Sequence, residues 1–257
     1  MYRYFDIGTG KPSAEERARA PHHLIDILEP AERIDAAAWA ERAEATISEI
    51  RARGKRPIVC GGSFLWVRAL VLGLAPLPGA DAEVRARHKQ IADRDGRAAL
   101  HVRLAEVDAS SAARLAPNDF VRVSRALEVF ELTGSPMSEW QARHGFREPR
   151  YEARLLGVQR ERAELDERIR ARVAGMLAHD FVKKMRRLLA AGHGEARAFG
   201  SVGYREIKEA VRTGGPIDET DLIERIARAT RVFARRQRTW LRDQPVEWLE
   251  PGSTQRA

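Results

Sequence analysis

Apolar residues in the first quarter of the chain follow a helical spacing and then form one short continuous run. A helix is predicted over 35–53, because Asp35 is a good N-cap, alanine-rich turns follow it, and Gly54 stops it. The apolar run Pro57–Cys60 predicts a strand, followed by a glycine-rich turn and a second helix from Phe64. This order of elements is typical of an α/β protein with a parallel sheet.

The middle of the chain shows only helical spacing. Helices are predicted over 82–94, 97–107, 110–115 and 118–132, with Asp119 as a cap for the last and Thr133-Gly134 at its end. We therefore expect an all-helical insertion, residues 77–145, within an α/β core formed by residues 1–76 and 146–257.

The last part returns to strand and helix patterns. Strands are predicted at Ala153–Val158 and Val246–Leu249, and one long helix over 160–191. A further helix spans about Thr220 to Arg242. The residues expected to be buried on these two helices are Leu165, Ile169, Val173, Met176, Leu177, Phe181, Leu188 and Leu189, then Leu222, Ile226, Val232, Phe233 and Trp240.

Composition narrows the class of protein. Of the 257 residues 44% are hydrophobic, enough for a real core, and 45 Lys+Arg against 37 Asp+Glu give a net charge of +8 that favours a polyanionic partner. The single cysteine, Cys60, excludes an internal disulfide and is expected to be buried. The chain shows neither a signal peptide nor an apolar membrane span, so a cytoplasmic protein without membrane contact is expected.

Two glycine-containing segments suggest anion binding. The run Gly8–Ser13 imitates a phosphate loop, but Phe5 replaces its first glycine and Pro12 replaces its Ser or Thr, so we reject it. Gly61-Gly62-Ser63 lies between a predicted strand and a helix N-terminus, where α/β proteins bind anions. A simple helix cap by Ser63 is the alternative.

Arginines mark three further candidates. Arg168 and Arg172 lie one turn apart beside the apolar stripe, a position that suits diphosphate, although a solvated face explains them equally. The helix from Asn118 carries two arginines, and the segment 231–242 mixes five arginines with Phe233 and Trp240. Basic residues beside aromatic rings suit a folded RNA, whereas a core stripe with charges outside it is the plainer interpretation. The residues alone therefore indicate an α/β protein with a helical insertion that binds an anion.

Several motifs, in order, resemble the bacterial tRNA dimethylallyltransferase family. They are DIGTGKPS from Asp6, PHHLIDILEP from Pro21, GGSFLWVRALVLGLAPLPGAD from Gly61, NDFVRVSRALEVFELTG from Asn118, GYREI from Gly203 and TRVFARRQRTWLR from Thr230. The match covers nearly the whole chain, and the order and length of the motifs make it specific.

The resemblance implies a fold and a reaction. The fold would be like that of P-loop kinases, with a parallel sheet core whose first strands are missing here and a helical insertion that grips the tRNA anticodon arm. The reaction would transfer a dimethylallyl group from dimethylallyl diphosphate, with Mg²⁺ assisting, to the exocyclic amine of an adenosine beside the anticodon. The adenosine would be flipped into a channel. A monomer is expected.

Site residues follow from the resemblance by position. Ser63 would line the channel, where the family has Thr, and Arg172 would bind the diphosphate. The residues expected to contact tRNA are Arg85, Val121, Arg122, Val123, Ser124, Arg125, Gly200, Ser201, Val202, Gly203, Tyr204, Arg205, Arg231 and Arg235. No metal ligand is expected among the residues of the chain.

The chain departs from the family pattern in three places. Val121 replaces a Gln, and His179–Lys184 stands where the family has a Gly followed by acidic residues. The family's phosphate loop and its general-base Asp lie upstream of the segment resembling Tyr2-Arg3. We therefore expect the general base upstream of Met1, no catalytic residue within 1–257, and a poorly soluble product without prenyl transfer when 1–257 is made alone.

Three functions compete at this point. The first is the family's prenyl transfer, the second is a tRNA-binding paralogue or fragment without catalysis, and the third is another enzyme with the same fold, such as a nucleotide kinase. The absence of a phosphate loop from the sequence argues against the kinase, and the TRVFARRQRTWLR segment argues for a prenyltransferase.

Overall fold

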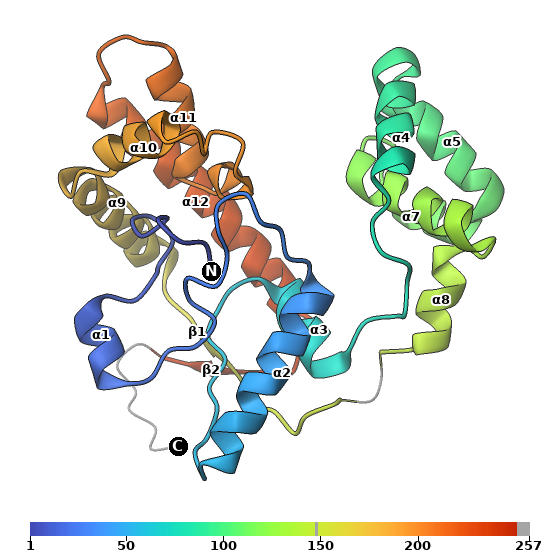
Figure 1. Cartoon of the computed structure of the whole chain (residues 1–257), viewed down its shortest axis with the longest axis horizontal. Helices are drawn as coiled ribbons and strands as arrows, with labels where there is room; N and C mark the ends of the chain where they lie inside the picture. Colours follow the sequence, from blue (N-terminus) through green and yellow to red (C-terminus); the bar gives the residue numbers. More distant parts are fainter. Residues whose placement is uncertain (147–148, 251–257) are drawn as a thin grey trace. The chain divides into compact units, whose positions relative to one another are not determined.

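The computed structural model describes residues 1–146 and 149–250 and divides the chain into two compact units. Unit 1 comprises residues 1–67 and 153–257, and unit 2 comprises residues 68–152 (Figure 1). The division thus falls several residues outside the expected insertion, 77–145. Unit 1 contains α1 (Ala14–Arg19), α2 (Ala36–Ala52), β1 (Leu155–Val158), α9 (Arg162–Ala178), α10 (Phe181–Ala190), η1 (Arg197–Gly200), α11 (Tyr204–Arg212), α12 (Glu219–Leu241) and β2 (Val246–Leu249).

The sheet of unit 1 consists of two parallel strands in the described part of the chain. β1 pairs with β2 in a register that sets Leu155 opposite Val246 and Val158 opposite Leu249. Both strands were predicted from the sequence, and their pairing is parallel as expected for an α/β core.

The predicted strand at Pro57–Cys60 is wrong. The segment has no regular secondary structure, Ile58 and Val59 are exposed, and Cys60 is an exposed thiol rather than a buried one. An apolar run becomes a strand only when a neighbouring strand accepts and donates its backbone hydrogen bonds. Within the described residues no strand pairs with this segment.

The single helix expected over 160–191 is two helices. α9 ends at Ala178, Asp180 adopts a left-handed conformation with φ of 63°, and α10 begins at Phe181. Asp tolerates this conformation better than most residues because its short polar side chain bonds locally. The predicted burial of the stripe is confirmed, since Ile169, Val173 and Leu177 on α9 and the apolar face of α10 all belong to one core.

Aromatic rings form the centre of that core. The ring of Tyr204 lies 5.0 Å from that of Phe5 and 4.8 Å from that of Phe181, and Phe5 packs edge-on against Phe199 at 5.2 Å. Such edge-to-face pairs add about 0.5–1.5 kcal/mol each beyond burial of their area. The N-terminal segment is thereby packed against residues about 180–200 positions later in the chain.

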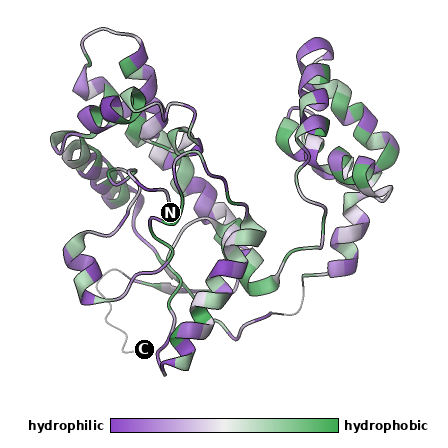
Figure 2. Cartoon of the chain, in the orientation of Figure 1, coloured by the Kyte–Doolittle hydropathy of each residue, from purple (hydrophilic) through white to green (hydrophobic). Residues whose placement is uncertain are grey.

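The regular secondary structure in the described residues of unit 2 is entirely helical. It contains most of α3 (Phe64–Leu72), with α4 (Ala82–Asp95), α5 (Arg97–Val107), α6 (Ala109–Arg114), α7 (Phe120–Thr133) and α8 (Met137–His144). Its core joins Leu100 and Leu104 of α5 to Val123, Ala126 and Leu127 of α7. Figure 2 shows hydrophobic and hydrophilic residues interleaved along these helices, as amphipathic helices around a core require. Asp119 caps α7, as predicted.

We expect Gly8→Ala to destabilise the protein more than Gly54→Ala. Both glycines have positive φ, +82° and +68°, so alanine is strained at either by roughly 1–2 kcal/mol. A Cβ on Gly8 would also stand 2.6 Å from Cζ of the buried Phe181, whereas nothing lies within 4 Å of one on Gly54. Overpacking adds about 1–3 kcal/mol. Urea unfolding of both variants measures the difference, and equal losses would contradict the packing described here.

Candidate nucleic-acid interface and diphosphate site

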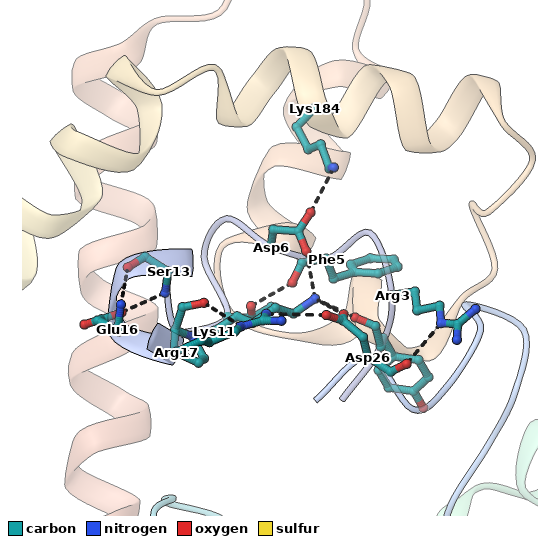
Figure 3. A network of polar contacts seen from close by, with 12 residues as sticks. Arg3, Phe5, Asp6, Lys11, Ser13, Glu16, Arg17, Asp26 and Lys184 are labelled. Atoms are coloured by element: carbon teal, nitrogen blue, oxygen red, sulfur yellow. Dashed lines mark hydrogen bonds and ion pairs between the residues drawn. The ribbon is translucent and has the colours of Figure 1, made fainter. Parts of the chain in front are cut away.

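Lys11 is the centre of a polar network in the N-terminal segment. Its side chain is 6% exposed, and its ammonium donates hydrogen bonds to the carbonyl of Tyr2 at 2.9 Å, to Asp6 at 2.7 Å and to Asp26 at 2.6 Å (Figure 3). Asp6 also accepts from Lys184 of α10 at 3.1 Å. The ammonium of Lys11 is therefore bound by other groups of the protein itself. This agrees with the rejection of Gly8–Ser13 as a phosphate loop.

Both carboxylates of this network are held ionised. Burial works to raise the pKa of Asp6, but hydrogen bonds from Lys11 and Lys184 outweigh it and leave that pKa below its ordinary value. The hydrogen bond from Lys11 is the largest cause of the lowered pKa of Asp26, and Arg17 lowers it further. The departure at His179–Lys184 thus has a structural role at its last residue, since Lys184 ties α10 to the first turn of the chain.

Arg172 lies beside this turn. Its Nη2 is 3.4 Å from the place that a Cβ on Gly10 would occupy, so glycine leaves room for the guanidinium. Arg172 is exposed and has no carboxylate partner in the described residues, whereas its neighbour Arg168 is paired with Glu164. An unpaired guanidinium next to a turn is available for an anion.

The turn of Ser63 packs against the C-terminal half of α12. Gln237 donates its Nε2 hydrogen to the carbonyl of Gly62 at 3.1 Å, and a Cβ on Gly62 would overlap the Gln237 side chain. The ring of Phe64 stacks on Trp240 at 5.9 Å. The structure therefore brings together two segments that the sequence suggested separately, with the exposed Ser63 at the start of α3.

α12 presents cations and aromatic rings to solvent. Phe233 is 45% and Trp240 37% exposed, which contradicts the expected burial of both. Arg235, Arg236 and Arg238 are exposed, and within the described residues none of them has a carboxylate partner. The helix needs only part of its surface for the core, so the ring of Phe233 is available to stack on a base beside charges that hold phosphates, whereas that of Trp240 already stacks on Phe64.

Arg231 differs from the other arginines of α12. Its guanidinium is paired with Asp166 of α9, which also accepts from Arg170. The hydrogen bond from Arg231 is the largest cause of the lowered pKa of Asp166. Arg231 thus links two helices, and a ligand would have to share it with that carboxylate.

In unit 2 the two arginines Arg85 and Arg125 meet at one buried carboxylate. Glu128 is 0% exposed and accepts from Arg85 at 2.8 and 2.9 Å, from Arg125 at 2.6 Å and from the amide of Asp81 at 2.7 Å. Arg125 also donates to the carbonyl of Pro78. Burial works to raise the pKa of Glu128, but the two arginines outweigh it and lower that pKa. This role was missed from the sequence, although an acidic residue on an otherwise buried face of a helix is a signal for it.

Only some residues of the expected tRNA-contacting segments are exposed. In the first segment Val121 and Arg122 are exposed, whereas Val123 is buried and Ser124 is buried with its hydroxyl beside a ring nitrogen of His88 at 2.9 Å. The side chain of Arg122 is 73% exposed, and among the described residues its ion-pair partner is Asp119 at 3.2 Å. Any RNA contact by side chains of this segment falls to its exposed members.

The second segment shows the same division. Gly200 and Ser201 are exposed, Val202 is half-buried, and Gly203 and Tyr204 are buried. Burial, together with the charge of Asp6, raises the pKa of Tyr204. Arg205 extends outward and pairs with Glu206 at 2.7 Å.

The fold and these sites define an α/β protein with a helical unit and several exposed, unpaired arginines suited to phosphate. The family model described as IPP transferase matches residues 1–244. The chain belongs to this family.

Relatives and a solved structure agree with that assignment. The tRNA dimethylallyltransferase of Sorangium cellulosum is 61% identical over 249 residues, covering 97% of this chain and 79% of the relative. That of Geobacter sulfurreducens is 46% identical over 252 residues, covering 97% and 80%. The crystal structure of the tRNA isopentenylpyrophosphate transferase from Bacillus halodurans matches with a TM-score of 0.66 at 33% identity, covering 97% of this chain and 78% of that one.

We expect Arg122→Ala to weaken tRNA binding and Arg125→Ala to lower the stability of the fold. Arg122→Ala removes an exposed cation, so stability should change by less than about 0.5 kcal/mol, while tRNA affinity falls and its salt-dependence slope decreases by roughly 1. Arg125→Ala removes one of the hydrogen-bond partners of the buried Glu128, so the free energy of unfolding should fall by about 2 kcal/mol or more. Denaturant unfolding and tRNA titrations at several salt concentrations measure both. A destabilised Arg122→Ala protein, or an unaffected Arg125→Ala protein, would contradict the assignment of roles.

Proposed function

We propose that the protein transfers a dimethylallyl group from dimethylallyl diphosphate to the exocyclic amine of an adenosine beside the anticodon of tRNA. Membership of the IPP transferase family and relatives named tRNA dimethylallyltransferase support this reaction. The observation that carries the RNA part is the exposed surface of α12, where arginines without a carboxylate partner among the described residues lie between Phe233 and Trp240 in the sequence. Phosphates and an unstacked base are bound by these groups in single-stranded RNA sites.

Each exposed site takes one part of the substrates in this proposal. Ser63 and α12 face the flipped adenosine and its neighbours, and the exposed Arg122 binds a phosphate of the anticodon arm, whereas Arg205 is held by the buried Glu206. Arg172 binds the diphosphate, whose negative charge grows as the bond to the allyl carbon breaks, so a guanidinium there stabilises the leaving group. The protein acts in the cytoplasm as a monomer.

We propose that Mg²⁺ accompanies the diphosphate. Within the described residues no group of three or more His, Cys, Asp or Glu side chains could hold a metal ion. In enzymes that act on phosphates, Mg²⁺ keeps several water ligands and is bound partly by the oxygens of the substrate itself. None of the helices in the described part of the chain is long and apolar enough to cross a membrane.

We expect labelled dimethylallyl diphosphate to modify unmodified tRNA at one adenosine in the presence of Mg²⁺. The assay compares this chain, which covers 79% of the Sorangium relative, with the same chain joined to the N-terminal segment of that relative. General-base catalysis is worth about 10²–10⁴-fold, so a general base supplied by the joined segment would make that form faster by such a factor. If both forms bind tRNA and neither transfers the label, the non-catalytic alternative holds.

We expect Arg172→Gln to lower turnover by roughly 10²-fold in the active form while tRNA affinity stays within about twofold, because the lost charge acts on the departing diphosphate. The matched control is Arg162→Ala, which removes an exposed arginine from the first turn of the same helix. Turnover and tRNA binding are measured separately for each variant. Full turnover by Arg172→Gln would show that α9 is structural only.

A further inference from the structure

A pocket of about 360 Å³ lies between η1 and α11, away from the sequence motifs apart from Gly200 and Arg205. This volume falls within the range of small-ligand sites, roughly 300–1,000 Å³. We refer to it as the η1–α11 pocket. Its floor includes the buried Phe199, and its charged lining comprises Arg197, Arg205, Lys208, Arg212, Glu195 and Glu209.

The charges of the pocket do not cancel. Glu209 is paired at 3.0 Å with Arg225, which is not part of the lining. Glu195 is fully exposed and reaches Lys208 only at 3.8 Å, a distance that contributes little in water. Arg205 is paired with Glu206. The pocket therefore keeps a surplus of positive charge after its internal pairs are formed.

Two cations of the pocket form no ion pair with a carboxylate of the described residues. Arg197 is exposed in η1 and Arg212 is exposed in the last turn of α11, and neither has an ion-pair partner within the described residues. Lys208, in contrast, is fixed in place. It donates to the carbonyl of Gly194 and lies 5.4 Å over the Phe199 ring. A fixed ammonium and two adaptable guanidinium groups lining one pocket are suited to the oxygens of a phosphate.

We propose that the η1–α11 pocket binds a backbone phosphate of the tRNA substrate through Arg197, Lys208 and Arg212. This inference rests on the proposed function and extends it, since none of these three residues lies in the motifs that suggested RNA binding. The pocket adjoins Gly200–Arg205, so an RNA held by that segment brings its backbone to the pocket. A polyanion also gains from a second, separate group of cations, because each neutralised phosphate releases counterions.

The test is tRNA binding by the double variant Arg197→Ala/Arg212→Ala at several salt concentrations. We expect weaker binding and a log–log salt slope that is smaller by about 2, roughly 1 for each lost contact. The matched control is Arg19→Ala/Arg53→Ala, which removes two exposed arginines of α1 and the α2 cap that also lack ion-pair partners in the described residues. The control should keep the wild-type slope.

Three outcomes overturn the proposal. The first is an unchanged slope in the pocket variant, and the second is an equal change in the control, which would show a general effect of net charge. The third is calorimetric binding of inorganic diphosphate that is lost in the pocket variant while tRNA binding is unchanged, because the pocket then takes a free anion. If the unaltered protein transfers the prenyl group and the pocket variant binds tRNA with the wild-type salt slope, this inference fails and the proposed function stands. Absence of tRNA binding by the unaltered protein contradicts both.

Discussion

The buried ammonium of Lys11 is the contact on which the arrangement of unit 1 most depends. It joins a backbone carbonyl and two carboxylates that are separated by up to 24 positions, and Asp6 extends the network to Lys184 of α10, 178 positions away. A buried lysine is stable only when such acceptors surround it. The turn that the network holds lies between Arg172 and Phe181, so one polar cluster fixes both the edge of the aromatic core and the neighbourhood of the candidate diphosphate arginine.

Local rules explain why most helices could be predicted from the sequence. Asp35 and Asp119 cap the helices that follow them, and the apolar stripe of α9 and α10 is buried as its spacing requires. The failures concern partners that are distant in sequence. The run Pro57–Cys60 has strand composition but no pairing strand among the described residues. The break between α9 and α10 depends on the left-handed conformation of Asp180, which a residue other than glycine adopts only where the surrounding structure requires it.

The candidate site was predictable by motif but not by role. From the sequence, Arg85, Arg122 and Arg125 were all expected to contact tRNA. In the structure Arg85 and Arg125 pair with the buried Glu128, and Arg122 is exposed. Phe233 and Trp240 were expected in the core and are exposed instead. Exposure of a ring depends on which face of α12 packs against α9 and α11, and that depends on contacts between segments far apart in the chain.

Two classes of arginine are therefore distinct in this protein, those that hold a buried carboxylate and those without a carboxylate partner in the described residues. A guanidinium that holds a buried carboxylate cannot leave it for RNA without exposing that charge to an apolar environment, a cost of several kcal/mol. A guanidinium without a partner loses only hydration and side-chain freedom when it meets a phosphate, and counterion release offsets that loss. The ligand-binding surface should thus follow the unpaired cations, Arg172, Arg197, Arg212 and the exposed arginines of α12, rather than the density of basic residues along the sequence.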